Sequence, residues 1–470
     1  MKILYVTSEA NPFAASGGLG DVMGALPAAV AAEGHECAVI LPLYDIVKPS
    51  VREKMELALD ITFNLAWRHT GASIYKIEHN KVTYYFVENH YYFERGRLYG
   101  EFDDSERFAF FSRAVVEFML SSGNVPDVLH ANDWQTAPAV VYLKTEYAHV
   151  DALKNVKTIY TIHNIEYQGK FGLHTLEDVF GLSSIYRGVV EFDGCINLMK
   201  GAIVSSDFVT TVSPNYANEL EHDFFAFGLS SIIRGSRHKM RGVINGIDYD
   251  YFSPEKGGDI YASYNNRNYK SGKAKNKAGL QEEVGLPVEP NIPLVVMITR
   301  FASQKGIDLV LHIMDELLEE NVQVIVLGTG EKEYEDAFRE MEARHPNIKA
   351  LIKFDRVISK KMYAGADIFL MPSKSEPCGL AQMIACSYGT IPVVRSVGGL
   401  YDSIRKYGEE GANGFRFDNY NAHELLFTVK DALALYSDKK KWNALTASAK
   451  KSNFTWENSA KEYISIYENL

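Results

Sequence analysis

Short apolar runs rich in β-branched residues alternate along the chain with longer segments whose apolar positions recur every three or four residues. The first run, 2–7, is followed by a Gly-rich segment, a helical pattern over 22–32 that stops before Gly34, and a second apolar run over 36–41. Glycine just after the last helical turn is a common helix end. The order strand, Gly-rich turn, helix, strand is typical of the opening βαβ unit of a doubly wound parallel sheet.

This alternation continues to the end of the chain with one interruption. Residues 255–279 are polar and rich in Gly, Lys and Asn, so we predict a loop there. A second βα series begins at 294–298, and two such series predict two doubly wound α/β domains. The stretch 456–467 has one apolar helical face. The other predicted elements are strands at 82–87, 128–130, 158–162, 208–212, 322–327, 348–353, 367–371 and 391–394, and helices at 105–120, 134–147, 306–320, 331–344, 379–388 and 421–436.

Composition narrows the classes of function. The 470 residues are 46% apolar and 23% charged, as in an ordinary globular protein. With 49 basic and 60 acidic residues, the formal net charge of −11 argues against a general nucleic-acid binder. The four cysteines form no Cys-x-x-Cys pair, which argues against a zinc ribbon or a disulfide framework. We see no targeting segment and no membrane-spanning apolar run, and therefore expect a cytoplasmic protein.

A Gly-rich loop, residues 16–21, directly follows the first predicted strand. Gly17 and Gly18 would let a ligand approach the backbone, and the start of the following helix offers free N–H groups to an anion. The spacing differs from Gly-x-Gly-x-x-Gly, so the loop is weak support for a nicotinamide site. On this loop alone, a ligand site and a plain tight turn are equally good interpretations.

Two basic residues follow the first strand of the second predicted domain. Arg300 and Lys305 lie at the carboxyl end of that strand, where ligands bind in open α/β sheets. A planar guanidinium and an ammonium point charge could together hold a diphosphate. The alternative is a solvated basic pair, and the position favours the ligand site.

Two further loops follow strands of the second domain. Glu376 precedes a helix start that could bind phosphate, and its carboxylate could accept hydrogen bonds from sugar hydroxyls or cap the helix. Cys378 could be a nucleophile, but a buried apolar side chain is the favoured interpretation. The loop 395–400 repeats the Gly-Gly-Leu of the first loop, which suits one phosphorylated ligand held from both sides.

Polar residues also end two strands of the first domain. His163 follows the strand at 158–162, a position that favours a functional role over a structural one. His130 and Asp133 form a similar cluster, in which Asp133 could simply cap the next helix. His-x-x-Asp without further ligands at metal spacing does not indicate a metal site.

Taken together and in this order, the motifs resemble the bacterial glycogen synthases and plant starch synthases over essentially the whole chain. Each motif alone is a weak signal, whereas the ordered set is highly specific. The motifs are Ser-Glu-Ala-x-Pro-Phe at 8–13, Gly-Gly-Leu-Gly-Asp-Val at 17–22, Gly-Ala-Leu-Pro at 24–27, His-Ala-Asn-Asp-Trp-Gln at 130–135, Thr-Ile-His-Asn at 161–164, Asn-Gly-Ile-Asp at 245–248, Arg300 with Lys305, Tyr-Ala-Gly-Ala-Asp at 363–367, Glu-Pro-Cys-Gly-Leu at 376–380 and Gly-Gly-Leu at 398–400.

The resemblance implies a GT-B fold, in which two doubly wound Rossmann-like domains face each other across a cleft. The expected parts are 1–244 on the acceptor side, 245–453 on the donor side, and a C-terminal helix at 454–470 that returns to the first domain. The implied activity is transfer of glucose from ADP-glucose to the non-reducing end of an α-1,4-glucan, glycogen or a maltooligosaccharide, with retention of configuration. The resemblance implies no cofactor, no metal, and no nucleic-acid or membrane partner.

The same resemblance assigns roles to single residues. Arg300 and Lys305 would stabilise the departing diphosphate, because without a metal fixed cations must take the developing charge. Glu376 would contact the donor glucose, and His163 would lie beside the transferred glucose. The expected donor-binding residues are Gly17, Gly18, Asp21, Asn245, Phe354, Cys378, Gly379, Leu380, Gly398, Gly399 and Leu400, with Phe354 against the base and the amides of Gly379, Leu380, Gly399 and Leu400 toward phosphate or sugar.

One position departs from the family pattern. The family usually carries Lys, then Thr or Val, before the first Gly-Gly-Leu, whereas this chain has Ala15 and Ser16. The missing cation leaves three alternatives open: UDP-glucose as donor, a catalytically weakened glucan-binding relative, or another GT-B transferase with a different donor or a small acceptor. The last is disfavoured, because that branch carries a second Glu eight residues after the first, where this chain has Ile384.

Overall fold

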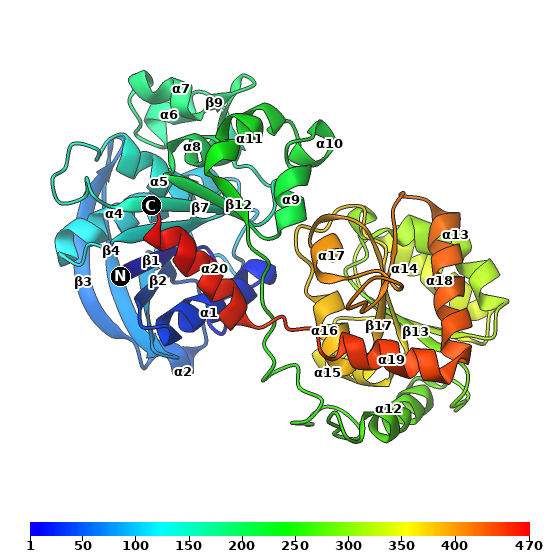
Figure 1. The fold of residues 1–470 in the computed structure, drawn as a ribbon. Coiled ribbons are helices and arrows are strands. Elements are labelled where there is room, and N and C mark those ends of the chain that lie inside the picture. The colour runs from blue at the N-terminus through cyan, green and yellow to red at the C-terminus, as the bar shows by residue number, and fades with distance from the viewer. The chain divides into compact units, whose positions relative to one another are not determined.

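The computed structural model describes residues 1–470 and divides them into two compact units. Unit 1 comprises Met1–Val243 and Trp456–Leu470, and unit 2 comprises Ile244–Thr455. Each unit is an α/β structure built on one large, mainly parallel sheet (Figure 1). None of the helices combines the length and the apolar character needed to cross a bilayer.

Unit 1 is built on a nine-stranded sheet with β1 (Lys2–Val6) near its middle. Seven neighbouring strands run parallel, and a long antiparallel hairpin extends one edge. The loops that follow the parallel strands therefore open at one edge of the sheet. In spatial order the strands are β12 (Met240–Gly242), β11 (Phe208–Thr211), β7 (Lys157–Ile162), β6 (Val128–Asn132), β1, β2 (Glu36–Pro42), β5 (Val82–Glu88), β4 (Arg68–His79) and β3 (Glu56–Leu65).

The C-terminal helix belongs to unit 1. This helix, α20 (Trp456–Glu468), packs against α1 (Gly18–Ala32) and buries Tyr463, Ile466 and Tyr467. The other helices of unit 1 include α3 (His90–Phe93), α4 (Asp104–Ser122), α5 (Ala137–Lys144), α8 (Leu198–Ser205), α9 (Pro214–Glu219) and α11 (Ser230–Ser236), and a small antiparallel sheet adds β8 (Lys170–Phe171), β10 (Cys195–Asn197) and β9 (Glu191–Phe192).

Unit 2 is a doubly wound domain around a six-stranded, all-parallel sheet. Its central strands are continuous apolar runs, as expected for strands covered on both faces. In spatial order they are β15 (Ile348–Ile352), β14 (Gln323–Gly328), β13 (Leu294–Ile298), β16 (Ile368–Met371), β17 (Ile391–Arg395) and β18 (Phe415–Phe417); the helices are α12 (Tyr269–Val284), α13 (Ile307–Leu318), α14 (Lys332–Arg344), α15 (Arg356–Gly365), α16 (Ala381–Tyr388), α17 (Gly398–Ser403), α18 (Ala422–Ser437) and α19 (Lys439–Ala449).

The loop predicted over 255–279 is wrong from residue 269 onward, where α12 begins. The buried face of α12 is made largely of Gly, Asn, Lys and Gln rather than of apolar residues, so no apolar period marks it. A Cβ on Gly272 would lie 2.2 Å from the Cβ of Tyr264, so only glycine allows this close packing. The predicted helix at 134–147 is also shorter, because α5 spans only Ala137–Lys144. The β3–β4 hairpin, α15 and α19 have no counterpart among the predicted elements.

Candidate active site

An ion pair lies at the carboxyl end of the unit 2 sheet. The Nζ of Lys305 lies 2.7 Å from the Oε2 of Glu376, and the hydroxyl of Ser373 donates to the same oxygen at 3.0 Å. Lys305 reaches this position from a 3₁₀ turn that ends at Gly306. A Cβ on Gly306, whose φ is +71°, would lie 2.2 Å from the carbonyl oxygen of Pro372, so this turn needs glycine. The structure thus brings together two of the predicted catalytic residues.

Arg300 follows β13 at the same edge of the sheet. Its side chain is exposed and makes no ion pair, whereas the next residue, Phe301, is fully buried. Gln304 accepts a hydrogen bond from the backbone N–H of Lys374 at 2.8 Å through its carbonyl oxygen, which ties this loop to the one that carries Glu376. Arg300 is therefore a free cation beside a paired one, as a diphosphate ligand would require.

The second Gly-Gly-Leu, residues 398–400, packs closely against the loop that carries Glu376. A Cβ on Gly398 would lie 2.0 Å from the carbonyl oxygen of Glu376, and one on Gly399 would lie 2.2 Å from that of Cys378. Gly399 donates its N–H to the carbonyl oxygens of Glu376 and Pro377, both at 3.1 Å, and Leu400 donates to Val397. The expectation that the amides of Gly399 and Leu400 are offered to a ligand is therefore wrong in this structure, because both already donate within the protein.

Gly379 and Leu380 differ from that pair, because no acceptor within the protein is found for their N–H groups. Gly379 has a φ of +72°, and a Cβ there would lie 2.6 Å from the Oε1 of Gln382. Gln382 fixes the loop by donating to the carbonyl of Gly379 at 2.9 Å. These two amides precede α16, where a helix N-terminus favours an anion.

Cys378 and Asn245 lie together in unit 2. The backbone N–H of Asn245 hydrogen-bonds to the thiol of Cys378, and burial raises the pKa of that thiol to about 12. The thiol is therefore protonated and is a poor nucleophile, in agreement with the favoured sequence interpretation. The Oδ1 of Asn245 is buried without a hydrogen-bond partner, so it remains free to accept from a ligand.

Phe354 is an exposed aromatic ring between β15 and α15. Its side chain is 81% exposed, and the guanidinium of Arg356 lies 5.9 Å from its ring centroid. An exposed phenyl ring at the carboxyl end of a parallel sheet is available for stacking with a planar ligand.

The glycines in the Gly-rich loop of unit 1 differ in how much space surrounds them. A Cβ on Gly17 or Gly18 would meet nothing within 4 Å, and the backbone of Gly17 is extended. A Cβ on Gly20, in contrast, would lie 2.4 Å from that of Ala15. Packing therefore explains Gly20 but neither Gly17 nor Gly18, which lie exposed at the N-terminal end of α1. The exposed Asp21 accepts a hydrogen bond from Asn11 at 2.6 Å in the same turn.

Glu9 holds this loop in place. Its carboxylate is 4% exposed and accepts hydrogen bonds from the N–H of Ser16 (2.5 Å), the N–H of Gly17 (3.2 Å) and the hydroxyl of Ser16 (3.0 Å). The hydroxyl of Tyr99 donates to it at 2.7 Å. Burial and the charge of Glu9 raise the pKa of Tyr99 well above its ordinary value, so this phenol keeps its proton.

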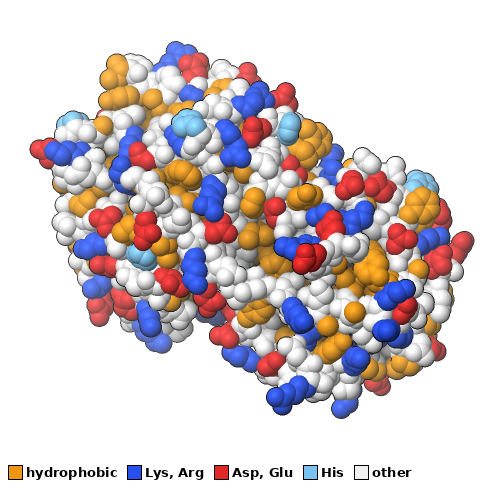
Figure 2. All heavy atoms as spheres, in the orientation of Figure 1, with side chains coloured by type: hydrophobic (Ala, Val, Ile, Leu, Met, Phe, Trp, Pro, Cys, Tyr) orange, Lys and Arg blue, Asp and Glu red, His pale blue; other side chains and the backbone are white.

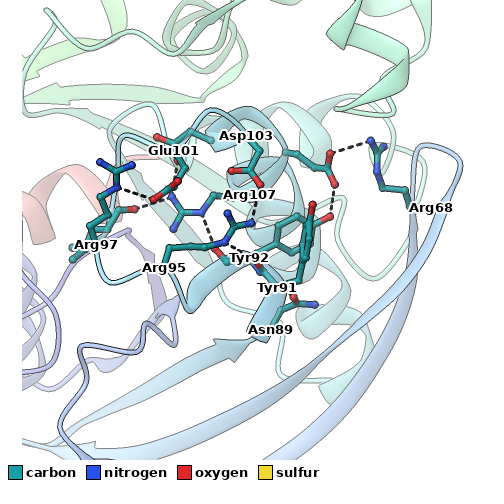
Figure 3. Close-up of polar contacts among 12 residues, drawn as sticks. Arg68, Asn89, Tyr91, Tyr92, Arg95, Arg97, Glu101, Asp103 and Arg107 are labelled. Atoms are coloured by element: carbon teal, nitrogen blue, oxygen red, sulfur yellow. Dashed lines mark hydrogen bonds and ion pairs between the residues drawn. The ribbon is translucent and has the colours of Figure 1, made fainter.

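The segment that carries Tyr99 is anchored by a buried arginine (Figure 3). The fully buried guanidinium of Arg107 donates to the carbonyl oxygens of Tyr92 (2.7 Å) and Leu98 (3.1 Å) and to the carboxylate of Asp104 (2.6 Å). Nearer the surface, Arg95 pairs with Asp103 and Arg97 pairs with Glu101. Arg107 thus fixes the segment through which Tyr99 reaches Glu9.

His163 has a defined proton. Asn132 donates its Nδ2 to the carbonyls of Val6 and His130, so its Oδ1 faces the Nε2 of His163 at 2.9 Å. This assigns the proton to Nε2 and leaves Nδ1 with a lone pair. Burial lowers the pKa of His163 to about 3, so the ring is neutral near pH 7. The free Nδ1 of His163 can therefore accept a hydrogen bond from a ligand, but the ring brings no charge.

Asp133 and His130 have structural roles. The carboxylate of Asp133 accepts from the backbone N–H of His163 at 2.8 Å instead of capping α5, whose N-cap is Thr136. Burial raises the pKa of Asp133 to about 7. His130 is fully buried and hydrogen-bonds to the hydroxyls of Tyr467 (2.9 Å) and Thr161 (2.5 Å), which ties α20 to the sheet.

Sequence reasoning missed Glu9, Tyr99 and Asn132 as site residues. Their positions at strand ends could have identified two of them, since Glu9 lies just after the first strand and Asn132 is the last residue of β6. The sequence carried no signal for the contact between Tyr99 and Glu9, because 90 residues separate them. No group of three or more His, Cys, Asp and Glu side chains is arranged to hold a metal ion.

Comparisons with known proteins match this architecture. The family described as starch synthase catalytic domain matches residues 2–235, and glycosyl transferases group 1 matches residues 281–452. A glycogen synthase of Alkaliphilus metalliredigens is 43% identical over 100% of both chains, and one of Geobacillus stearothermophilus is 41% identical over 100% of this chain and 98% of that one. The chain belongs to the glycogen and starch synthase family.

A solved structure supports the same family, and a second supports the fold. The catalytic domain of starch synthase IV from Arabidopsis thaliana, bound to ADP and acarbose, has a TM-score of 0.90 and 32% identity, covering 99% of this chain and 98% of that one. A sucrose-phosphate synthase from Thermosynechococcus elongatus, at 16% identity and a TM-score of 0.62, shares the fold alone; it covers 100% of this chain and 98% of that one. The expected GT-B fold is confirmed, and this member of the glycogen and starch synthase family is a glycosyltransferase.

Proposed function

We propose that this protein is a glycogen synthase that transfers glucose from ADP-glucose to the non-reducing end of an α-1,4-glucan with retention of configuration. The observation that carries the proposal is the Lys305–Glu376 pair beside the free Arg300, at the carboxyl end of the unit 2 sheet. Cations fixed at this edge match the charge that a departing nucleoside diphosphate develops. Membership in the glycogen and starch synthase family supplies the glucan as acceptor.

In unit 2, the loops bind the donor and stabilise the leaving group. The ammonium of Lys305 carries three N–H groups, so it can stay bonded to Glu376 and still donate to a phosphate oxygen. Arg300 supplies a second cation, and the free amides of Gly379 and Leu380 supply neutral donors. The bond from glucose C1 to the diphosphate oxygen breaks as the acceptor hydroxyl attacks C1 from the same face, and the proton of that hydroxyl passes to the departing diphosphate oxygen. Charge then builds on oxygens that face fixed donors, without a bound metal.

In unit 1, the residues position the sugar. Neutral His163 and its backbone carbonyl lie at the end of β7, where they would contact hydroxyls of the transferred glucose. The open backbone at Gly17 and Gly18 would accept a ligand approaching the start of α1. Glu9 is not free to bind the sugar, because its carboxylate already accepts four hydrogen bonds from Ser16, Gly17 and Tyr99.

ADP-glucose is proposed as the donor because the starch synthase similar to this chain is bound to ADP. The exposed ring of Phe354 can stack on the base of either ADP or UDP, so it supports a nucleotide donor without choosing between them. The four free cysteines agree with a reducing cytoplasm, where we propose that the reaction takes place.

A donor competition tests the proposal. The full chain is incubated with glycogen and equimolar ADP-glucose and UDP-glucose, and the released ADP and UDP are quantified, with Lys305→Met as the control for enzyme-dependent release. Mostly ADP, with label incorporated into glycogen, is the expected result. Mostly UDP would contradict the donor and keep the reaction, whereas release of neither would contradict synthase activity.

Ala15 favours one competing candidate, a catalytically weakened glucan-binding relative. This candidate predicts glycogen binding without release of either nucleotide, even in the Ala15→Lys variant. The arrangement of Arg300, Lys305, Glu376 and His163 argues against it, because no residue of the predicted catalytic set has been replaced.

A further inference from the structure

A pocket with a volume of about 170 Å³ lies in unit 2 where α12, α18 and α19 meet. It lies at the amino end of the sheet: Asp367, which lines it, precedes β16 and accepts the N–H of Leu294 at the start of β13. Arg300 and Glu376 follow the opposite ends of these two strands. The pocket is therefore distinct from the candidate active site.

The pocket is strongly cationic although the chain as a whole is acidic. Four lysines line it, with Asp367 as the only acidic residue among them. Figure 2 shows basic side chains at the surface over α12 and α19. A concave site with this excess of positive charge attracts anions. The lysines are Lys270, Lys273, Lys277 and Lys439.

The internal contacts leave most of this charge without a counter-ion. Asp367 is committed to Lys277, at 2.7 Å, and that lysine also donates to the hydroxyl of Tyr436 at 3.2 Å. Lys273 bonds only to neutral acceptors, with its shortest bond to the hydroxyl of Thr390 at 2.8 Å. Lys439 makes no ion pair, and its Nζ lies 3.2 Å from the ring centroid of Tyr436. Asp367 is thus the only counter-ion among the four lysines that line the pocket.

Burial lowers the pKa of two of these lysines. The pKa of Lys273 falls to about 7, mainly through burial; the charge of Asp367 opposes this shift, and those of Lys450 and Lys277 add to it. Burial likewise lowers the pKa of Lys439, with Asp367 opposing and Lys277 adding. A bound anion would offset the cost of burying these charges and favour the protonated lysines.

Thr446 provides an independent sign of a missing partner. It lies on α19, is 3% exposed and lines the pocket, yet its hydroxyl has no hydrogen-bond partner. A buried hydroxyl without a partner costs about 1–3 kcal/mol, so a ligand or water that bonds to it at this position would stabilise the protein. An oxyanion can accept from this hydroxyl and from the ammonium groups of Lys270 and Lys439, while Lys273 and Lys277 already donate within the protein.

We propose that this pocket, lined by Lys270, Lys439 and Thr446 with Lys273 and Lys277 beneath, is a binding site for a small phosphate-type oxyanion. The size fits this class: about 170 Å³ is well below the roughly 300–1,000 Å³ of pockets for drug-sized ligands. The anion is inorganic phosphate or the phosphoryl group of a phosphomonoester whose remainder projects outward. Binding joins α12 to α19 and stabilises unit 2.

Thermal unfolding of the full chain tests the proposal. The midpoint is measured in phosphate, in glucose 1-phosphate and in chloride at equal ionic strength, which removes general salt effects. Phosphate is expected to raise the midpoint by about 2–4 °C relative to chloride. Each of Lys439→Gln and Thr446→Val should lose at least half of this shift. Lys440→Gln, the same charge change at an exposed neighbour on α19 that does not line the pocket, should keep it.

Two controls make the result decisive. Thr446→Val removes an unpartnered hydroxyl, so in chloride its midpoint should equal or exceed that of the parent protein, and a smaller phosphate shift then cannot reflect general damage. The double variant Arg300→Ala, Lys305→Ala should retain the shift. An absent shift, a shift equal in all variants, or one lost only in the double variant would overturn the proposal. A shift with phosphate alone identifies the free ion, and a shift with both anions identifies the wider class.

Discussion

The ammonium of Lys305 lies 2.7 Å from the carboxylate of Glu376, and the hydroxyl of Ser373 holds the same oxygen from a fully buried position. The side chains of Lys305 and Glu376 are only 19% and 10% exposed, so the pair is shielded from water on most sides. A cation held in this way is positioned before any substrate arrives, which is the arrangement that stabilises charge developing in a transition state.

Replacing Lys305 by Met should lower kcat by about 10²–10³-fold, because one preorganised donor to the leaving group is removed while the length of the side chain is kept. Steady-state kinetics with ADP-glucose at saturating glycogen measures the effect. Lys332→Met, at an exposed position on α14, is the matched control and should leave kcat unchanged. A loss confined to KM for the donor would contradict a role in the transition state.

Ala15→Lys should raise kcat/KM for ADP-glucose by about 5–50-fold, equivalent to about 1–2.3 kcal/mol, because it adds a cation beside the open backbone of Gly17 and Gly18. Ala15→Met supplies the same length without charge and should show no gain. Equal kcat/KM values for the Ala15→Lys variant and the parent protein would mean that other residues already balance the charge of the donor diphosphate. A loss in both variants would instead indicate a clash with Gly20.

Much of the fold was predictable because its signals are local. The periodic apolar face at 456–467 predicts α20, and apolar runs such as 294–298 predict the parallel strands. The α12 helix was not predicted because its buried positions include the polar residues Asn276, Lys277 and Gln281, which produce no apolar pattern. The β3–β4 hairpin has mixed, half-exposed positions and lies at the edge of the sheet, so its alternation is weak.

Some features of the candidate site were likewise predictable from the sequence, and others were not. Arg300 and Lys305 were predictable because ligands bind where parallel strands end. The contact of Lys305 with Glu376 was not, since it depends on how two loops 71 residues apart pack. The commitment of the Gly399 amide to Glu376 and Pro377 likewise follows from tertiary contact alone. Chain position thus predicts which side chains reach the edge of a sheet, whereas their remaining hydrogen-bonding capacity requires the three-dimensional structure.

Arg107→Met should destabilise unit 1 by about 3–5 kcal/mol, because it leaves the carboxylate of Asp104 and the carbonyls of Tyr92 and Leu98 without their buried donor. Urea unfolding measures the loss. Arg97→Met, which breaks an ion pair whose arginine is 60% exposed, is the matched control and should cost far less, because water screens an exposed pair. Similar costs for the two variants would contradict the anchoring role of Arg107.

Acidification should destabilise unit 1 through His130. Burial lowers the pKa of His130 to about 3 in the folded state, so between about pH 6.5 and pH 3 the unfolded chain binds a proton that the folded chain does not. Stability must therefore fall as the pH drops through this window. Urea midpoints from pH 7 to pH 4.5 should fall less steeply for His130→Gln than for the parent protein. Parallel slopes would show that His130 titrates normally in the folded state.

Asp133 should act in the opposite direction. Burial raises its folded pKa from 3.8 to about 7, so the folded chain holds a proton that the unfolded chain has lost. The resulting stabilisation is complete below about pH 4 and is lost as the pH rises through about 7. Asn keeps an oxygen that accepts from the N–H of His163 and tolerates the φ of +58° at this position. The stability of Asp133→Asn relative to the parent protein should therefore improve by roughly 2 kcal/mol from pH 5 to pH 8. A constant difference across that range would mean that Asp133 is ionised throughout.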